Sequence, residues 1–194
     1  MFVSRFRTVE PAEAAVSLAD VKSYLYVTDS DTDDLITQQI SAAVQWVEDN
    51  GNIALITQTL RASFYEIGAD RTFILPSPPL QSVTTLEYLD ENATWQTLAS
   101  GKYDLEADRK PGRAKIRSGE VPTVHATISP KWRITYVAGY AADAATFKTK
   151  QPALHSLIQK LVRDINEGCG LPEGKAAKTI LDLYRVQPIS LGAA

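Results

Sequence analysis

The period of the hydrophobic residues changes twice along this 194-residue chain, and these changes separate two helical stretches from a central one of strands. The first dozen residues mix charged and small side chains, so we expect residues 1–16 to form an N-terminal arm. Ser17 stands three residues before Asp20, a spacing typical of a helix start. A short helix is predicted over about 17–26 from its apolar residues Leu18, Val21 and Leu25.

A longer amphipathic helix is predicted from Ser30 or Asp31 to about Asn50, with Asn50-Gly51 as a C-cap. No Lys or Arg stands between Lys22 and Arg61. The helix dipole favours carboxylates at the start of this helix, but it does not explain the missing basic residues. The acidic residues of the segment are Asp29, Asp31, Asp33, Asp34, Glu48 and Asp49.

From about Thr57 apolar and polar residues alternate, which predicts strands. Pro- and Gly-containing turns separate the short segments, as in a compact antiparallel unit. The further candidate strands are 73–75, 83–89, 95–98, 103–105, 114–117, 125–128 and 132–138.

Helical spacing returns after Pro152 and continues to Gly168, and a further short helix is predicted over 176–184. We therefore predict an α+β fold, in which a small helical bundle is formed by the N- and C-terminal helices and an antiparallel β unit is inserted between them. The predicted segments are the bundle (17–56 and 150–184), the β unit (57–149) and an extended C-terminal tail (185–194).

Composition places few limits on function. The net charge of −3 gives no overall basic surface for gripping nucleic acid. The single cysteine, Cys169, rules out an internal disulfide framework. Neither a signal peptide nor a membrane-spanning stretch is visible, so we expect a protein of the cytoplasm, or of a particle assembled there, without membrane contact.

Catalytic and ligand-binding motifs are missing or incomplete. The segment 170–175 is one residue too short for a phosphate-binding loop, and Ala176 replaces the Ser or Thr that would bind magnesium. Asp29 to Asp33 begins like a calcium loop, but Ile40 stands where the bidentate Glu belongs, so helix capping is favoured. His155 is expected at the surface or an interface. We expect no enzyme, no cofactor and no metal site.

Three segments resemble the head–tail connector (adaptor) proteins of long-tailed phages and of gene transfer agents. The resemblance covers about 17–185. It is carried by SLADVKSYL with the following DTDDLITQQISAAVQWVEDNGNIALITQTL, by ILPSPPLQSVTTLEYLD, and by WRITYVAGY. It implies a homo-oligomeric ring, usually of twelve subunits, in the virion neck beneath the portal protein. The C-terminal region would dock on the portal, the opposite face would receive a stopper or tail-side protein, and double-stranded DNA would pass through without specific binding.

Two surfaces follow as hypotheses. We expect the C-terminal residues to order on the portal, because Tyr and Arg are enriched at interface hot spots and the tail has apolar residues without a helical pattern. The proposed docking residues are Tyr184, Arg185, Val186, Ile189 and Leu191. Glu48 and Asp49 are predicted to face the channel, where a lining without basic residues would not hinder phosphates.

Other functions remain open at this stage. A stopper or tail-completion protein would also be found in a neck, although the helical stripes at both ends of the chain favour the adaptor. A small enzyme or a ligand-binding module would need a concave site in the β unit.

Overall fold

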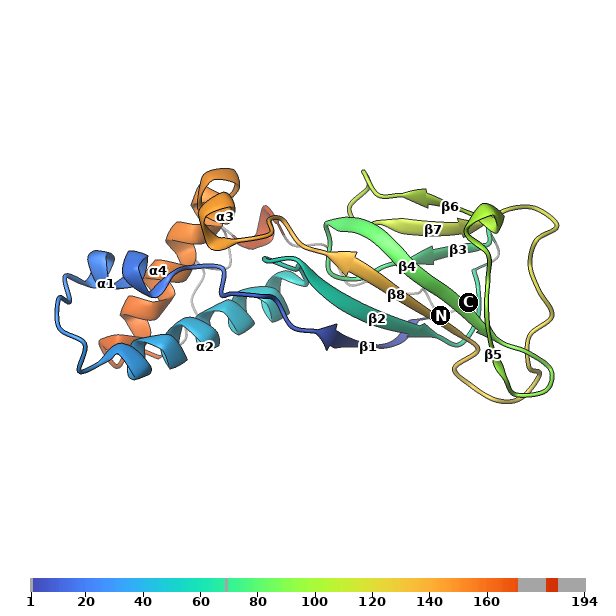
Figure 1. Ribbon diagram of the computed structural model, residues 1–194, viewed down its shortest axis with the longest axis horizontal. Coiled ribbons are helices and arrows are strands. Elements are labelled where there is room, and N and C mark those ends of the chain that lie inside the picture. The colour runs from blue at the N-terminus through green and yellow to red at the C-terminus, as the bar shows by residue number, and fades with distance from the viewer. Residues whose placement is uncertain (1, 69, 171–180, 185–194) are drawn as a thin grey trace. The chain divides into compact units, whose positions relative to one another are not determined.

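The computed structural model describes residues 2–68, 70–170 and 181–184, and they form two compact units. The helical unit contains the described residues of 11–57 and 139–186, and the β unit contains those of 1–10 and 58–138. Figure 1 shows each unit with its elements labelled. The α+β fold, with an antiparallel β unit inserted between helical segments, confirms the prediction.

Four helices make up the helical unit. Helix α1 (Leu18–Leu25) is capped by Ser17, whose hydroxyl accepts a hydrogen bond from the Asp20 backbone N–H at 3.1 Å. The other helices are α2 (Asp33–Gly51), α3 (Ala144–Lys150) and α4 (Pro152–Asn166). None of the described helices is long and apolar enough to cross a bilayer.

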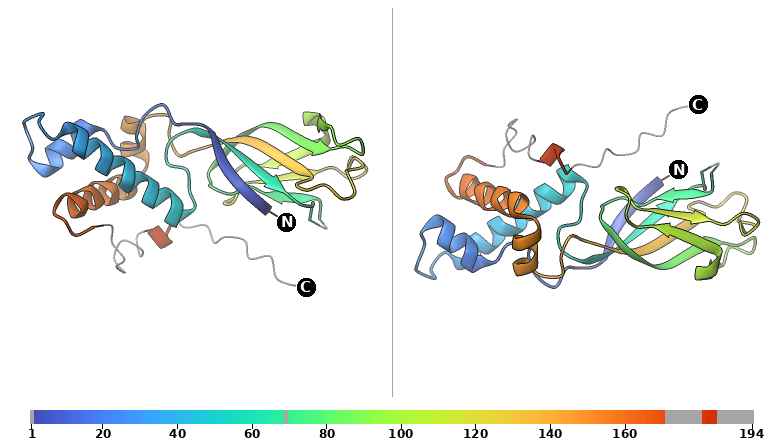
Figure 2. Two further views of the ribbon diagram at one scale, coloured as in Figure 1. Left: turned by 90° about the horizontal axis from the view of Figure 1, so that it is seen from below. Right: turned by 90° about the horizontal axis from the view of Figure 1, so that it is seen from above.

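The core of the helical unit is almost entirely aliphatic. Helices α2 and α4 lie side by side (Figure 2), and their inward faces meet α1 and the loop after α2. Burial of such stripes supplies most of the stability of helices of this length. The fully buried residues include Val21, Ile36, Val47, Leu55, Phe147, Leu154, Ile158 and Leu161.

Two antiparallel sheets form the β unit. The larger has the order β1-β2-β8-β4-β5, and the smaller has the order β3-β7-β6 with the short 3₁₀ helix η1 (Ser100–Lys102) before β6. The strands are β1 (Phe2–Val9), β2 (Gln58–Phe64), β3 (Thr72–Ile74), β4 (Leu80–Leu89), β5 (Trp95–Thr97), β6 (Tyr103–Glu106), β7 (Arg113–Ile116) and β8 (Trp132–Ala138).

Aromatic rings from both sheets meet in the core of the β unit. Phe73 of β3 lies with its ring centroid 5.0 Å from that of Phe64 and 5.2 Å from that of Trp132. Each of the three rings belongs to the face of its sheet that is turned toward the other sheet. Side chains at alternate positions of β2 and β8 are buried here, as the predicted alternation requires.

Within the described residues the structure differs from the sequence analysis at three places. Residues 2–9 of the expected arm form the edge strand β1, in which charged side chains alternate along the chain. Residues 125–128 form no strand, because His125 Nδ1 accepts hydrogen bonds from the Thr127 and Ile128 N–H groups and bends the chain. Helix α3 begins inside the segment 57–149, where only β structure was expected. Most of the predicted helix 176–184 lies outside the described residues.

Candidate interaction surfaces

The aspartate-rich loop between α1 and α2 is closed by a lysine. Lys22 Nζ donates to the Asp29 carbonyl oxygen and to Asp33 Oδ1, both at 2.5 Å. Asp33 and Asp34 stand in the first turn of α2, where the helix dipole stabilises carboxylates. In the described parts of the chain no three or more His, Cys, Asp or Glu side chains gather as a metal site would require. The sequence analysis compares the segment 170–175 with a phosphate-binding loop, and residues 171–175 of it lie outside the described residues.

His155 is buried inside the helical unit, whereas the sequence analysis expected it at the surface or at an interface. Its Nε2 atom is 3.6 Å from Asp20 Oδ2, and Lys148 Nζ is 2.6 Å from Asp20 Oδ1. Burial lowers the pKa of His155, and the hydrogen bond from Lys148 is the main cause of the lowered pKa of Asp20. The cluster therefore joins α1, α3 and α4. Its position on α4, in line with the buried Leu154 and Ile158, was a signal of burial that the sequence contained.

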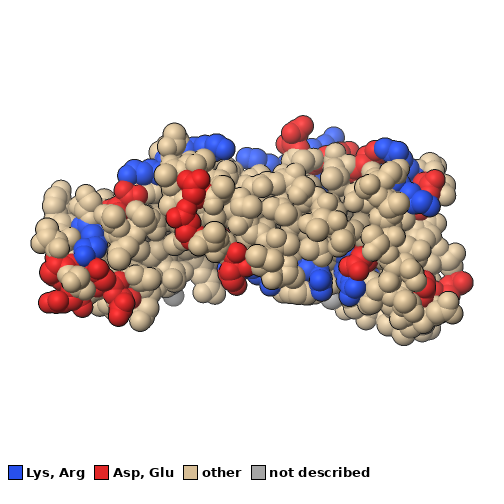
Figure 3. Space-filling model, viewed as in Figure 1, with Lys and Arg blue, Asp and Glu red and all other residues tan. Residues whose placement is uncertain are grey.

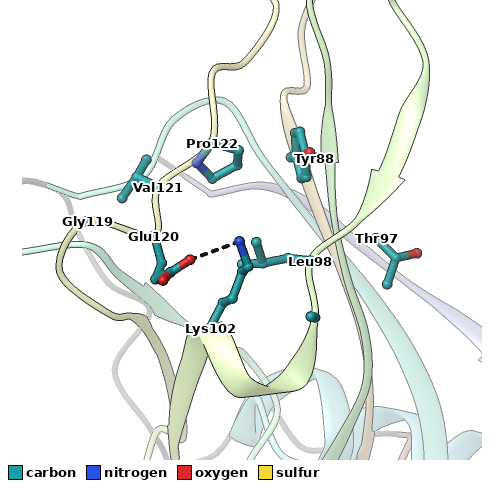
Figure 4. A pocket seen from close by; sticks show the side chains of 9 residues that line it. Tyr88, Thr97, Leu98, Lys102, Gly119, Glu120, Val121 and Pro122 are labelled. Atoms are coloured by element: carbon teal, nitrogen blue, oxygen red, sulfur yellow. Dashed lines mark ion pairs between the residues drawn. The ribbon is translucent and has the colours of Figure 1, made fainter.

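A hollow of about 260 Å³ lies in the β unit between the β4–β5 region and the segment 119–122 (Figure 4). Its walls combine apolar side chains such as Leu98 and Val121 with one ion pair, Lys102 Nζ to Glu120 Oε2 at 2.9 Å. The contact with Glu120 raises the pKa of Lys102, so the ammonium stays charged and paired. Both charged side chains of this lining, Lys102 and Glu120, are partly exposed and paired with each other, so neither is a buried charge that could hold a ligand.

The two predicted channel residues have different environments. Glu48 is only 7 % exposed, and its Oε1 accepts a hydrogen bond from the Leu55 N–H at 2.9 Å. The Glu48 carboxylate is therefore directed into the helical unit, where it holds the loop after α2. Asp49 is exposed on α2, and its place in the channel stays a prediction.

Among the predicted docking residues, Tyr184 packs against its own unit. Its ring meets the Tyr140 ring edge to face, with centroids 6.5 Å apart, and the nearby Leu181 packs on Gly51. Leu183 points outward and is 83 % exposed. The other four, Arg185, Val186, Ile189 and Leu191, lie outside the described residues, so the portal-docking hypothesis stays a prediction for them.

The outer face of the five-stranded sheet carries a surface that the sequence analysis did not identify. Phe6, Arg61 and Thr135 lie side by side across β1, β2 and β8 on this face. The Arg61 guanidinium lies 5.5 Å from the Phe6 ring centroid, and its Nε approaches Thr135 Oγ1 at 3.4 Å. We call Phe6, Val9, Arg61 and Thr135 the arginine face. The sequence analysis predicts an arm in place of strand β1, so the sequence did not indicate this surface.

The loop after α1 forms a second exposed surface. Tyr26 ends α1 with φ 59°, a left-handed conformation that glycine usually occupies, and its side chain is 93 % exposed. Three exposed carboxylates, Asp29, Asp31 and Asp34, follow within the next turns. We call these four residues the acidic tip. Figure 3 shows acidic side chains gathered over this end of the helical unit.

Comparisons with known proteins agree with this architecture. Residues 15–84 match the family described as phage gp6-like head-tail connector proteins. No curated protein sequence matches the chain.

Solved structures match nearly the whole chain. A chain from the neck of an empty gene transfer agent (GTA) particle, computed with C6 symmetry, is 16 % identical with a TM-score of 0.79, and the match covers 98 % of this chain and 99 % of that one. A chain from the neck of a native GTA particle, computed with C12 symmetry, is 17 % identical with a TM-score of 0.77 and the same two coverages. A chain of the native GTA virion matches at 16 % identity with a TM-score of 0.77, again covering 98 % and 99 %.

At these identities the structural likeness establishes a shared fold, which extends well beyond the segment matched by sequence. The resemblance to phage head–tail connector proteins is thus confirmed, by the gp6-like family match over residues 15–84 and by a fold shared almost end to end with neck proteins of gene transfer agents.

Proposed function

We propose that this chain is a structural subunit of a ring in the neck of a virion, where it joins the head to the tail and leaves a passage for double-stranded DNA. The observation that carries the proposal is the family match over residues 15–84, supported by the fold shared with neck chains over 98 % of the sequence. The role is structural and not catalytic. The neck matched at C12 symmetry supports a ring of this chain with twelve copies.

Within that ring, we assign the tail-ward and head-ward contacts by analogy with the connector family. The portal protein would meet the C-terminal residues after Tyr184, and a stopper or tail-side protein would meet the opposite face. The contact of Tyr184 with Tyr140 supports a fixed starting point for the docking segment. Truncation after Tyr184 preserves that contact and should abolish portal binding, whereas unchanged binding would contradict the docking proposal.

The DNA passage is the second part of the proposal. Helix α2 carries no basic residue, and its exposed Asp49 would repel phosphates weakly. A lining of this kind lets DNA slide because it offers no counter-charge to bind. Asp49→Lys should slow DNA delivery from joined particles, and normal delivery would remove Asp49 from the channel.

The proposal is tested by deleting the gene and imaging the particles by negative-stain electron microscopy, with a complemented strain as the control. We expect separate filled heads and free tails in the deletion, and joined particles after complementation. Joined particles in the deletion would overturn the connector function.

A further inference from the structure

The acidic tip exposes an aromatic ring and three carboxylates in a fixed loop. Among the described residues, no Lys or Arg forms an ion pair with Asp29, Asp31 or Asp34, because the nearby Lys22 is engaged with Asp33 and with the Asp29 carbonyl. The two bonds of Lys22 tie the loop to α1, and the Asp31 N–H bond to Asp29 Oδ1 at 3.2 Å holds it further. The loop is therefore ordered before it meets a partner, which reduces the entropy cost of binding.

The arginine face has the complementary composition. Phe6 is 47 % and Val9 57 % exposed on β1, beside the guanidinium of Arg61. Within the described chain no carboxylate lies in ion-pair distance of Arg61, whose neighbours are the Phe6 ring and the Thr135 hydroxyl. On the same sheet Arg133 is neutralised, because it forms a bidentate pair with Glu87 at 2.8 and 2.9 Å and covers the Trp95 ring. Arg61 is partly exposed, and among the described residues it has no carboxylate partner, so a carboxylate from outside could pair with it.

We propose that the acidic tip of one copy docks on the arginine face of the next copy in the ring, with the tip carboxylates on Arg61 and the Tyr26 ring beside Phe6. This inference rests on the proposed function. A closed ring of identical chains needs two different, complementary patches on each subunit. The two surfaces have opposite charge, each includes an exposed apolar side chain, and they belong to different units of the chain.

Other occupants of the acidic tip fit the chemistry less well. DNA phosphates would be repelled by its carboxylates. A basic surface of another neck protein would satisfy the tip but would leave Arg61 and Phe6 without a partner. A tip-to-tip contact would place like charges together, which is unfavourable.

The contact is tested by crosslinking in assembled particles. In a Cys169→Ser background, which leaves no other cysteine, the pair Tyr26→Cys and Phe6→Cys is treated with a short bis-maleimide. We expect a ladder of dimers, trimers and longer species on a denaturing gel. The control pair Tyr26→Cys and Leu105→Cys, with Leu105 exposed on the three-stranded sheet, should give none. Joined particles without a ladder, or dimers from Tyr26→Cys alone, would overturn the proposal.

Charge-reversal variants test the same contact independently, so the test does not depend on whether the cysteine variants enter particles. Arg61→Glu alone and the Asp31→Lys/Asp34→Lys variant should each reduce joined particles at least about tenfold, because a like-charge contact recurs at every junction of the ring. The chain carrying all three substitutions should restore them. Unimpaired assembly of the separate variants, or no restoration by the combination, would contradict the proposal while leaving the connector function intact. The connector function itself would be contradicted only if heads and tails join in the absence of the unaltered chain.

Discussion

The two units of this chain are stabilised in different ways. The helical unit is stabilised by aliphatic stripes whose residues lie close together in the sequence of each helix. Its ion pairs, such as that of Lys148 with Asp20, connect one helix to another. The β unit depends on pairings between distant segments and on the contact of three aromatic rings. The comparison teaches that local patterns are enough to predict the longer helices of the first unit, while the second unit is specified by register and by ring packing.

The largest effect is expected in the aromatic core of the β unit. Trp132→Ala removes a fully buried ring that contacts Phe73 and Tyr88, and should cost about 3–5 kcal/mol of unfolding free energy. Leu157→Ala on α4 is the matched change in the helical unit, with an expected cost of about 2–4 kcal/mol. Urea unfolding followed by far-UV circular dichroism compares the two. Equal midpoints for Trp132→Ala and the unaltered chain would contradict the role of the ring cluster.

The chain re-enters the helical unit after β8 through a glycine that no other residue can replace easily. Gly139 has φ 147°, and an added Cβ would lie 2.5 Å from the Thr57 backbone nitrogen. Gly139→Ala should therefore cost about 3 kcal/mol, because backbone strain and a clash with main-chain atoms add together. Gly101→Ala is the control, since nothing lies within 4 Å of the added methyl group. The difference in thermal midpoint between the two variants measures the effect.

The prediction of the separate elements from sequence succeeded where the period was clear. Helix α1 and strand β8 were placed within a residue or two, and the stripe of α4 was found up to its C-terminal end. Strand β1 was missed because edge strands tolerate the charges that made it resemble an arm. Helix α3 was missed because it has only seven residues, too few to show a period.

The arrangement of the strands and the surfaces could not be predicted in this way. Strand β8 lies between β2 and β4, and no local pattern in its seven residues specifies those neighbours. The arginine face depends on that order, since Phe6, Arg61 and Thr135 are far apart in sequence. Glu48 was expected to face the channel because the sequence shows its charge but not the Leu55 N–H that it satisfies.

A smaller effect is expected from the buried carboxylate of the helical unit. Glu48→Ala leaves the Leu55 N–H without its acceptor and should cost about 1–3 kcal/mol, whereas Glu48→Gln keeps an acceptor oxygen and should cost less. Chemical denaturation of both variants gives the comparison. An equal loss in the two would show that the charge, and not the hydrogen bond, stabilises the loop.

The smallest effect is a pH dependence in the helical unit. Burial lowers the pKa of His155, so the unfolded chain binds the proton more readily than the folded one. Stability should therefore fall as the pH drops below about 6.5 toward the lower folded value. The charged groups facing His155 are Asp20 and Lys148. The lowered pKa of Asp20 contributes stability that is lost progressively as the pH falls through the ordinary value of 3.8 toward the lower folded value, below the window of His155.

His155→Gln should remove the upper part of this dependence. Thermal unfolding midpoints are measured at pH 7.5 and at pH 5.5 for His155→Gln and for the unaltered chain. If the two units unfold independently, the midpoint of the β unit should be the same in the two proteins. If the midpoint falls by the same amount between pH 7.5 and pH 5.5 in His155→Gln as in the unaltered chain, this pH dependence does not come from His155.

The most direct test of the proposed connector function is a cryo-electron microscopy reconstruction of the neck of particles produced in the complemented strain. We predict a ring of copies of this chain directly beneath the portal, with the helical and β units recognisable in the density. A neck that is complete without this chain would contradict the account.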